Sequence, residues 1–427
     1  MRGTVAASLV VVAATAAGSV ANFLFQWLAA RRLDAGDFSL LAAMLAIVTV
    51  ALLPGAPLGI AIVRRLIAER SAGAGAPDAV PGLARARRTG IGAGLALLAA
   101  IGAASALGGD RLHVGGSGWP LLWLGAAAAT ASWLAIVPEL SRVQAAGRFA
   151  SYGRAQMLLA ASRLLFGGGA LLLGAGPAVA LLCLAPGPWL VRATLPRTGA
   201  AEELRVPWLR ELAGPFAATG GLHALIVLDV VFARAHFAAE DPAAAGSYAI
   251  CSTLARALFH LPYAITAVTV QRTSAAAAAG LPRRGILLSN LGIAALLVAG
   301  GVGILGGFPG LAIEVFSGRD ASDAEMELLR RLLLPMALAS LAAVPAHFLL
   351  ALGRRSPLWI LGAAPLALAI LLARPVASPE ELVPPLIVVE GLTLAALLAA
   401  AISSPGGRGR GSDPRSARTP RDGRAPP

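Results

Sequence analysis

Lysine does not occur in this 427-residue chain, and only 13% of the residues are charged. An ordinary soluble domain is about a quarter charged. Aromatic residues make up 5% of the chain, whereas hydrophobic residues make up 57%. These proportions exclude a soluble globular protein, a disordered protein and a fibrous one. They favour a chain that meets lipid over most of its surface.

Cysteine and histidine are scarce as well. The two cysteines, Cys183 and Cys251, both lie inside apolar runs, which predicts small buried side chains and no disulfide framework. The five histidines are widely separated in the sequence, so no metal cluster is expected. A Walker-type phosphate-binding loop is also absent, so the sequence predicts no ATP-hydrolysing site in this chain. The sequence therefore predicts neither a cofactor nor a metal.

All 35 basic residues are arginine, and with 22 acids they give a net charge of +13. In a soluble protein this excess would suggest nucleic acid. Here the arginines cluster in short segments between apolar runs, as membrane topology requires, so no nucleic-acid partner is expected.

Twelve apolar runs approach the roughly 20 residues that a helix needs to cross the hydrocarbon core. They occupy residues 5–28, 38–63, 91–107, 119–137, 155–173, 178–195, 212–233, 246–270, 285–306, 332–352, 358–373 and 382–402. A cleavable signal peptide is an alternative for the first run, but its length and its ordered polar face favour a membrane helix.

The distribution of arginine sets the predicted orientation. With the N-terminus inside, the inner segments carry 25 Arg and 8 acids, whereas the outer segments carry 7 Arg and 12 acids. Both termini are therefore expected in the cytoplasm. The Gly-, Pro- and Arg-rich residues 404–427 predict a disordered basic tail. The abundance of Ala, Gly and Arg is typical of a high-GC bacterium, so we expect the bacterial inner membrane.

Five sequence matches at nearly constant offset indicate an internal repeat. The offsets are 203 for Arg31 and Arg234, 208 for Pro54 and Pro262, 208 for Arg64 and Arg272, 207 for Pro138 and Pro345, and 206 for Arg148 and Arg354. With six spans, each half begins and ends on the same side of the membrane, so the two halves have the same orientation. The predicted fold is all-α, with two pseudo-symmetric six-helix lobes at residues 1–195 and 211–403 around a central cleft. Residues 196–210 form the expected cytoplasmic linker.

Three stretches carry a resemblance to a known family. They are Asn22-Phe23-Leu24-Phe25-Gln26 with the following Ala30-Arg31-Arg32-Leu33 and Phe38, then Leu228-Asp229-Val230 with Leu261-Pro262-Tyr263-Ala264, and Glu314-Val315-Phe316-Ser317-Gly318. Together they resemble bacterial polysaccharide-biosynthesis flippases, which belong with multidrug and toxin extrusion transporters and lipid II flippases. Ser39 departs from this pattern, because a glycine is usual there.

The resemblance implies a fold of twelve to fourteen spans in two six-helix lobes and a transport activity. It implies a flippase that moves a lipid-linked oligosaccharide or polysaccharide precursor by alternating access. The expected partners are a polyprenyl-linked anionic glycan, membrane lipid and glycan-assembly enzymes.

Arginines inside apolar runs are the main candidates for binding cargo, because a charge in the membrane needs a partner or a wet cavity. Arg256 shares a helix face with Ser252 and His260, at spacings of four residues. It either lines the cavity or forms a structural pair with Asp229. Arg163 either lines the cavity or joins a helix–helix network. Arg234, near the end of a run, either binds cargo or snorkels.

The first run carries a neutral polar stripe. Thr15, Ser19, Asn22 and Gln26 recur at spacings of four, three and four residues, which places them in one narrow sector of a helix. Amide and hydroxyl groups both donate and accept hydrogen bonds, so the stripe suits sugar hydroxyls or helix packing equally. In the resembled family this helix borders the cleft, which favours cargo contact by Asn22 and Gln26.

Asp229 and Glu390 are the two acids inside apolar runs and the candidates for ion coupling. Asp229 either neutralises Arg256 or binds a coupling proton or sodium ion, and Glu390 has the same alternatives. Guanidinium groups pair well with phosphate oxygens. The excess of intramembrane arginine over acid therefore favours an anionic cargo.

Three other functions were weighed against a flippase. A multidrug or metabolite exporter of the same fold is the main alternative. A membrane glycosyltransferase or ligase is disfavoured, because the outer loops are short and carry no recognisable catalytic set, so we expect no enzyme. A non-transporting scaffold is the third.

Overall fold

The computed structural model describes residues 2–55, 58–59, 62–63, 66, 83–107, 119–195, 219–279 and 281–403, and these contain helices and no strand. The predicted linker at 196–210 and tail at 404–427 lie outside the described residues.

In the first half of the chain the helices are α1 (Arg2–Arg32), α2 (Ala35–Ala51), α4 (Leu83–Leu107), α5 (Trp119–Ala145), α6 (Phe149–Ser162), the π-helix η1 (Arg163–Gly168), α7 (Gly169–Leu172), α8 (Pro177–Leu182) and α9 (Pro186–Thr194). In the second half they are α11 (Leu228–Phe237), α12 (Pro242–His260), α13 (Tyr263–Ala278), α14 (Arg284–Gly307), α15 (Pro309–Ser317), α16 (Asp323–Ala351), α17 (Ser356–Leu372), the 3-10 helix η2 (Pro379–Leu382) and α18 (Val383–Ile402).

Eight helical segments of the described chain are long and apolar enough to cross a membrane. They are Ala84–Ala106, Trp119–Ala145, Phe149–Leu172, Pro177–Thr194, Thr219–Phe237, Arg284–Gly307, Asp323–Ala351 and Pro379–Ile402. Each overlaps one of the twelve predicted runs. The remaining runs coincide with α1, with the shorter apolar helices α2 and α17, and with α12 and α13. The all-helical membrane architecture is therefore confirmed in outline.

Prolines at repeat-related positions have matching effects. Turns interrupt the helix at residues 52–54, which include Pro54, and at residues 261–262, which end in Pro262. A proline removes a backbone donor and clashes with the preceding turn, which explains both breaks. The run predicted at 246–270 is consequently two helices, α12 and α13, and not one.

A second local feature also occurs twice. Gly147 and Gly353 both adopt positive φ, at 70° and 66°. The amide that follows each glycine bonds back five residues, from Arg148 to Val143 O at 3.1 Å and from Arg354 to Leu349 O at 3.0 Å. These left-handed helix ends, which favour glycine, come 206 residues apart.

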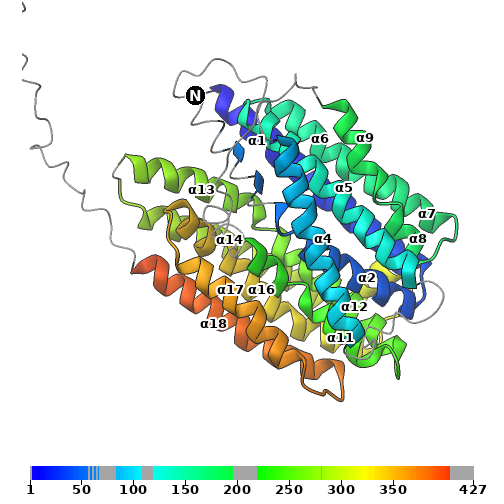
Figure 1. The fold of residues 1–427 in the computed structure, drawn as a ribbon. Helices are drawn as coiled ribbons and strands as arrows, with labels where there is room; N and C mark the ends of the chain where they lie inside the picture. Colours follow the sequence, from blue (N-terminus) through cyan, green and yellow to red (C-terminus); the bar gives the residue numbers. More distant parts are fainter. Residues whose placement is uncertain are drawn as a thin grey trace, which may run out of the picture.

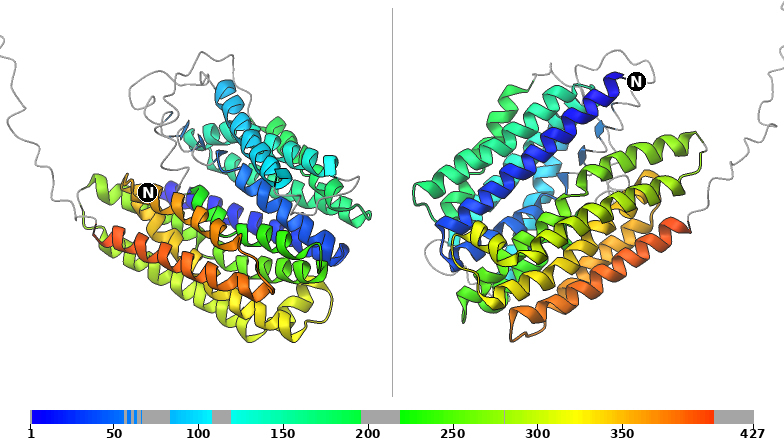
Figure 2. Two further views of the ribbon diagram at one scale, coloured as in Figure 1. Left: turned by 60° about the horizontal axis from the view of Figure 1, so that its bottom comes forward. Right: turned by 180° about the vertical axis from the view of Figure 1, so that it is seen from behind.

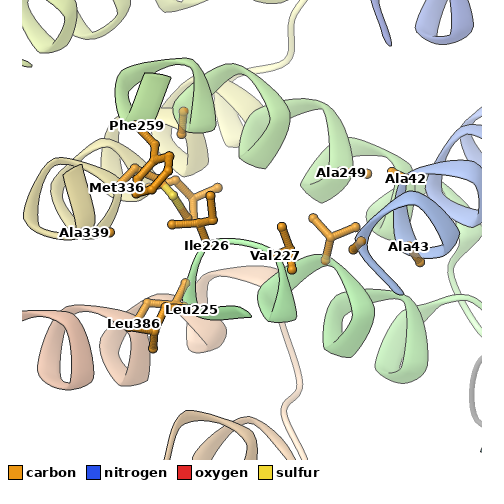
Figure 3. Close-up of a cluster of buried hydrophobic side chains, with 14 of the residues drawn as sticks. Ala42, Ala43, Leu225, Ile226, Val227, Ala249, Phe259, Met336, Ala339 and Leu386 are labelled. Carbon is orange, nitrogen blue, oxygen red and sulfur yellow. The ribbon is translucent and has the colours of Figure 1, made fainter. Parts of the chain in front are cut away.

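Helices from the two halves of the chain gather on two sides of the molecule, as Figures 1 and 2 show. They meet where α2 packs against α11 and α12. The residues at this contact are small or aliphatic, among them Ala42 and Ala43 of α2 and Ala249 of α12 (Figure 3). A Cβ atom on Gly246 of α12 would lie 2.6 Å from the carbonyl oxygen of Ala35, so the two backbones touch.

Large apolar side chains cover much of the outer surface. On α14 the exposed residues include Leu288, Leu296 and Ile304, and Leu296 is 76% exposed. An exposed apolar belt of this extent is unfavourable in water and suits a lipid-facing helix.

Candidate functional site

A buried polar cluster lies between α11 and α12 in the second half of the chain. Asp229 is fully buried, and its Oδ2 atom accepts hydrogen bonds from Ser252 Oγ at 2.5 Å and from the Tyr248 hydroxyl at 3.4 Å. Arg256 donates from Nη2 to Ser252 Oγ at 2.9 Å and lies 3.8 Å from Asp229 Oδ1. Arg256 and Asp229 are therefore paired, which is one of the two alternatives that the sequence left open for Arg256.

Local sequence places these groups together. The helix containing residues 219–225 is interrupted at Ile226–Val227, and α11 restarts at Leu228, so Asp229 occupies the first turn of a helix inside the apolar interior. The positive end of a helix dipole stabilises a carboxylate there. On α12, Tyr248 lies four residues before Ser252, so it extends the face that the sequence predicted for Ser252 and Arg256.

Glu390 adds a second acid to this region. It is fully buried on α18, which packs against α16, and it lies within electrostatic range of both Asp229 and Tyr248. Neither carboxylate oxygen of Glu390 has a hydrogen-bond partner among the described residues. Buried polar groups are nearly always satisfied, so Glu390 is an exception among the buried side chains of this region.

Arg163 lies in a separate polar site in the first half of the chain. It begins the π-helix η1, donates from Nη1 to Asn22 Oδ1 of α1 at 2.6 Å and stands 5.9 Å from the centre of the Phe25 ring. No carboxylate forms an ion pair with it within the described part of the chain, and its Nε atom has no hydrogen-bond partner there. π-helical turns are frequently found at functional sites.

The polar stripe of α1 is part of this first-half site. Ser19, Asn22 and Gln26 are half-buried, and Asn22 contacts Arg163 directly. The side chain of Thr15 lies outside the described residues. Gln156 of α6, the helix that precedes η1, donates to the Tyr152 hydroxyl at 2.9 Å.

Arg234 lies away from both polar sites. Its side chain is buried, and Nη1 donates to Gly36 O at 2.8 Å and to Ser39 Oγ at 2.6 Å. These bonds join α11 to the first turn of α2. Ser39, where the resembled family usually has glycine, supplies one of the acceptors.

Further contacts between the two halves lie at the end of the molecule where Arg234 bonds to α2. Trp27 Nε1 and Arg31 Nη2 of α1 each donate to Val315 O of α15 at 2.8 Å. The Phe316 ring packs against Phe23 and Phe38. We call this set of contacts, together with those of Arg234, the closed end. The ribbons of α1 and α13 diverge toward the opposite end (Figure 2).

Sequence reasoning missed one grouping. His223 lies within electrostatic range of His260 and of His347, which come from two other segments. Their wide separation in the sequence gave no sign of this proximity. No group of three His, Cys, Asp or Glu suited to a metal occurs in the described residues.

Solved structures identify the class of fold, which is that of the MATE transporters of the MOP superfamily. A multidrug-resistance MATE-family transporter in an inward-facing conformation has a TM-score of 0.66 and 13% identity, and the alignment covers 92% of this chain and 97% of that one. A eukaryotic MATE transporter, AtDTX14, has a TM-score of 0.64 and 15% identity over 95% and 96% of the two chains.

The lipid II flippase MurJ, in an inward closed conformation, has the same fold. Its TM-score is 0.56 at 11% identity, with 91% of this chain and 88% of that chain covered. No protein-family model and no curated protein matches the sequence. The fold that the sequence resemblance implied is therefore confirmed in outline.

Proposed function

We propose that this chain is a membrane flippase that moves a lipid-linked oligosaccharide or polysaccharide precursor across the bacterial inner membrane by alternating access. The fold that it shares with MATE transporters and with MurJ supports a transporter. The two polar sites described above, one in each half of the chain, hold no recognisable catalytic set. We therefore propose a carrier and not an enzyme.

Arg163 is the observation that supports an anionic cargo most directly. Its partners are the neutral amide of Asn22 and the face of Phe25, so its positive charge is not balanced by a described carboxylate. An unbalanced guanidinium at membrane depth is unfavourable unless an anion completes the site. A pyrophosphate between a polyprenyl tail and a sugar head supplies such an anion. Asn22 and Gln26 are then placed to meet the sugar.

The architecture we propose has twelve spans in two parallel six-helix lobes, at residues 1–195 and 211–403, with a cytoplasmic linker at 196–210 and a cytoplasmic tail at 404–427. The matching turns at Gly147 and Gly353 support an internal repeat. With both termini inside, the closed end faces outward, because α1 ends there and α2 begins there. The structure then represents an inward-facing state, in which Arg234 contributes to outer closure and not to cargo binding.

Asp229 and Glu390 are the proposed coupling groups. Together with Arg256 they place two acids and one base in the apolar interior. If both acids were ionised, the cluster would carry one uncompensated negative charge, which is costly in a membrane. Uptake and release of one cation, a proton or sodium, would change this balance in each transport cycle.

A multidrug exporter is the second candidate. Two MATE transporters align with TM-scores of 0.66 and 0.64, compared with 0.56 for the flippase. A cationic drug would need acidic groups exposed to it, whereas Asp229 and Glu390 are fully buried. This burial favours the flippase.

A deletion strain distinguishes the flippase from the multidrug exporter. Loss of the gene should remove a surface glycan and cause its lipid-linked precursor to accumulate on the cytoplasmic side. An exporter would instead leave the glycan intact and make the cell more sensitive to lipophilic cations. This second outcome would replace the flippase with the exporter.

Complementation tests the role of Arg163. Arg163→Gln should reach the membrane in normal amount and fail to restore the glycan. The matched control is Arg192→Gln, since Arg192 donates to Glu139 at 2.9 Å and lies outside the proposed cargo site. Full restoration by Arg163→Gln would remove Arg163 from cargo binding.

A further inference from the structure

Two arginines of the closed end stand at matching places in the two halves of the chain. Arg31 lies in the last turn of α1 and Arg234 in the last turn of α11, and they are 203 residues apart. The next helix begins in the same way in both halves, because an aspartate side chain caps it, Asp34 for α2 and Asp241 for α12. Each arginine therefore precedes an equivalent helix start.

Arg31 crosses from the first half of the chain to α15 in the second. The last carbonyls of a helix lack partners within it. In α15 the Gly318 amide bonds to Glu314 O at 2.8 Å, and Val315 O accepts from Arg31 Nη2 and from Trp27 Nε1, each at 2.8 Å. The negative end of the helix dipole favours a guanidinium there. Because α1 packs mainly against α6 and η1 of its own half, this crossing ties it to the other half.

Arg234 makes the reverse crossing, from the second half to the first turn of α2. Its Nη1 donates to Gly36 O at 2.8 Å and to Ser39 Oγ at 2.6 Å. The Ser39 hydroxyl itself donates to Gly36 O at 2.8 Å, so the nitrogen, the hydroxyl and the carbonyl all bond to one another. The side chain of Arg234 is buried, whereas Arg31 is exposed. The two crossings therefore differ in their access to water.

The chemistry of these acceptors makes the crossings reversible. The oxygens of Val315, Gly36 and Ser39 are neutral, and a hydrogen bond from a guanidinium to such an acceptor costs less to break than a buried ion pair. Opening of this end would admit water, which can replace each acceptor. Contacts of this kind favour one state of the molecule without making the other inaccessible.

We propose that Arg31 and Arg234 are reciprocal latches that hold the outer end closed. Each half sends one arginine to a main-chain carbonyl of the other, and the outer end opens when both are released. This inference rests on the proposed alternating access, and it names the contacts that set the balance between the inward-facing and outward-facing states. Release of Arg234 should cost more, because it is buried and makes two bonds. The two costs should add, because the arginines share no acceptor.

Spin labels measure the state of the outer end without transport. A cysteine-free full chain in nanodiscs receives one label in each half, at Leu173→Cys and Glu240→Cys, which are exposed outer positions in the proposed orientation. Double electron–electron resonance should give mainly one short distance. Arg234→Gln should raise the population of a longer distance about tenfold, Arg31→Gln less, and the double variant most.

Two controls match these variants in position. Arg32→Gln removes the neighbouring exposed arginine, which takes no part in the bonds to Val315. His236→Gln removes a contact of α11 that stays within the second half, from His236 Nε2 to Leu372 O at 2.7 Å. Both controls should keep the short distance. Controls that open the outer end as far as the latch variants do would overturn the proposal.

Ser39→Gly provides a milder test of the second latch. It removes one acceptor of Arg234 and leaves the arginine in place, so its effect should be smaller than that of Arg234→Gln. It also carries the test if Arg234→Gln does not fold. Unchanged outer distances in Arg31→Gln and in Ser39→Gly would overturn the latches.

A second pair of labels separates the latches from the proposed function. Ala150→Cys and Arg355→Cys place labels at exposed inner positions of the two halves. If access alternates, the variants that lengthen the outer distance should shorten the inner one. An outer distance that lengthens while the inner one stays unchanged would support the latches and contradict alternating access alone.

Discussion

The hydroxyl of Ser252 lies 2.5 Å from the Oδ2 atom of Asp229, and the same hydroxyl accepts a hydrogen bond from Arg256 at 2.9 Å. One small side chain thus links an acid on α11 to a base on the next helix. The direct approach of Arg256 to the carboxylate is longer, at 3.8 Å. Ser252 therefore fixes the geometry of the pair.

Ser252→Ala is expected to lower both stability and transport. A hydrogen bond to a charged group contributes about 2 kcal/mol, and its loss leaves a buried carboxylate oxygen with a weaker partner. The next residue provides a matched control, because the buried Thr253 hydroxyl has no hydrogen-bond partner among the described residues. Thermal unfolding should show a lower midpoint for Ser252→Ala and an equal or higher one for Thr253→Val. Equal midpoints for the serine variant and wild type would contradict this role.

Removing either member of the Arg256–Asp229 pair should abolish transport, with unequal effects on stability. Arg256→Gln leaves two buried acids without a cation, whereas Asp229→Asn leaves one buried acid and keeps Arg256. Breaking a buried pair costs about 3–5 kcal/mol. We expect that cost for Arg256→Gln and a smaller one for Asp229→Asn.

Chemical or thermal unfolding of the purified variants measures these costs, and membrane insertion is checked in parallel. The double variant should be more stable than Arg256→Gln alone, because it removes one of the two acids. Normal transport by Arg256→Gln would exclude this residue from the mechanism.

The polar stripe of α1 should be reachable by water. Gln26 is half-buried, whereas its neighbour Phe25 is fully buried against η1. In a background without Cys183 and Cys251, a cysteine replacing Gln26 should react with a water-soluble thiol reagent and one replacing Phe25 should not. The rate of labelling in intact membranes measures the difference. Complete protection at both positions would mean that the stripe serves helix packing.

Gly246→Ala should destabilise the contact between the two halves. The added Cβ atom would lie 2.5 Å from Ala35 Cβ, so α2 and α12 would have to separate. Such overpacking costs about 1–3 kcal/mol. On α14, Gly300 has no neighbour within 4 Å, so Gly300→Ala should instead gain up to about 1 kcal/mol of helix propensity. If Gly246→Ala and Gly300→Ala shifted the unfolding midpoint in the same direction, this interpretation of the contact would be contradicted.

Periodicity within single helices was readable from the sequence. The shared face of Ser252 and Arg256 follows from spacing alone, and the structure joins the two side chains directly. The repeat offset likewise paired Arg148 with Arg354, and both follow a left-handed glycine. These features depend on a few consecutive residues, which is why the sequence carries them.

Contacts across helices could not be predicted in the same way. Arg163 and Asn22 are 141 residues apart, and the hydrogen bond between Ser252 and Asp229 joins two different helices. The interruption at Ile226–Val227 and the π-helix at Arg163 were also missed, because neither contains proline. Tertiary packing determines both the contacts across helices and these irregularities within helices, so no local sequence pattern predicts them.

The backbone contact between Gly246 and Ala35 has a mechanical consequence. Side-chain contacts can loosen by a change of rotamer, but two touching backbones have no rotamer to change. In the proposed cycle the outer end has to open, so α2 and α12 must part at this point by moving as whole helices. A residue without a side chain thus makes the outer seal a backbone contact that only helix movement can break.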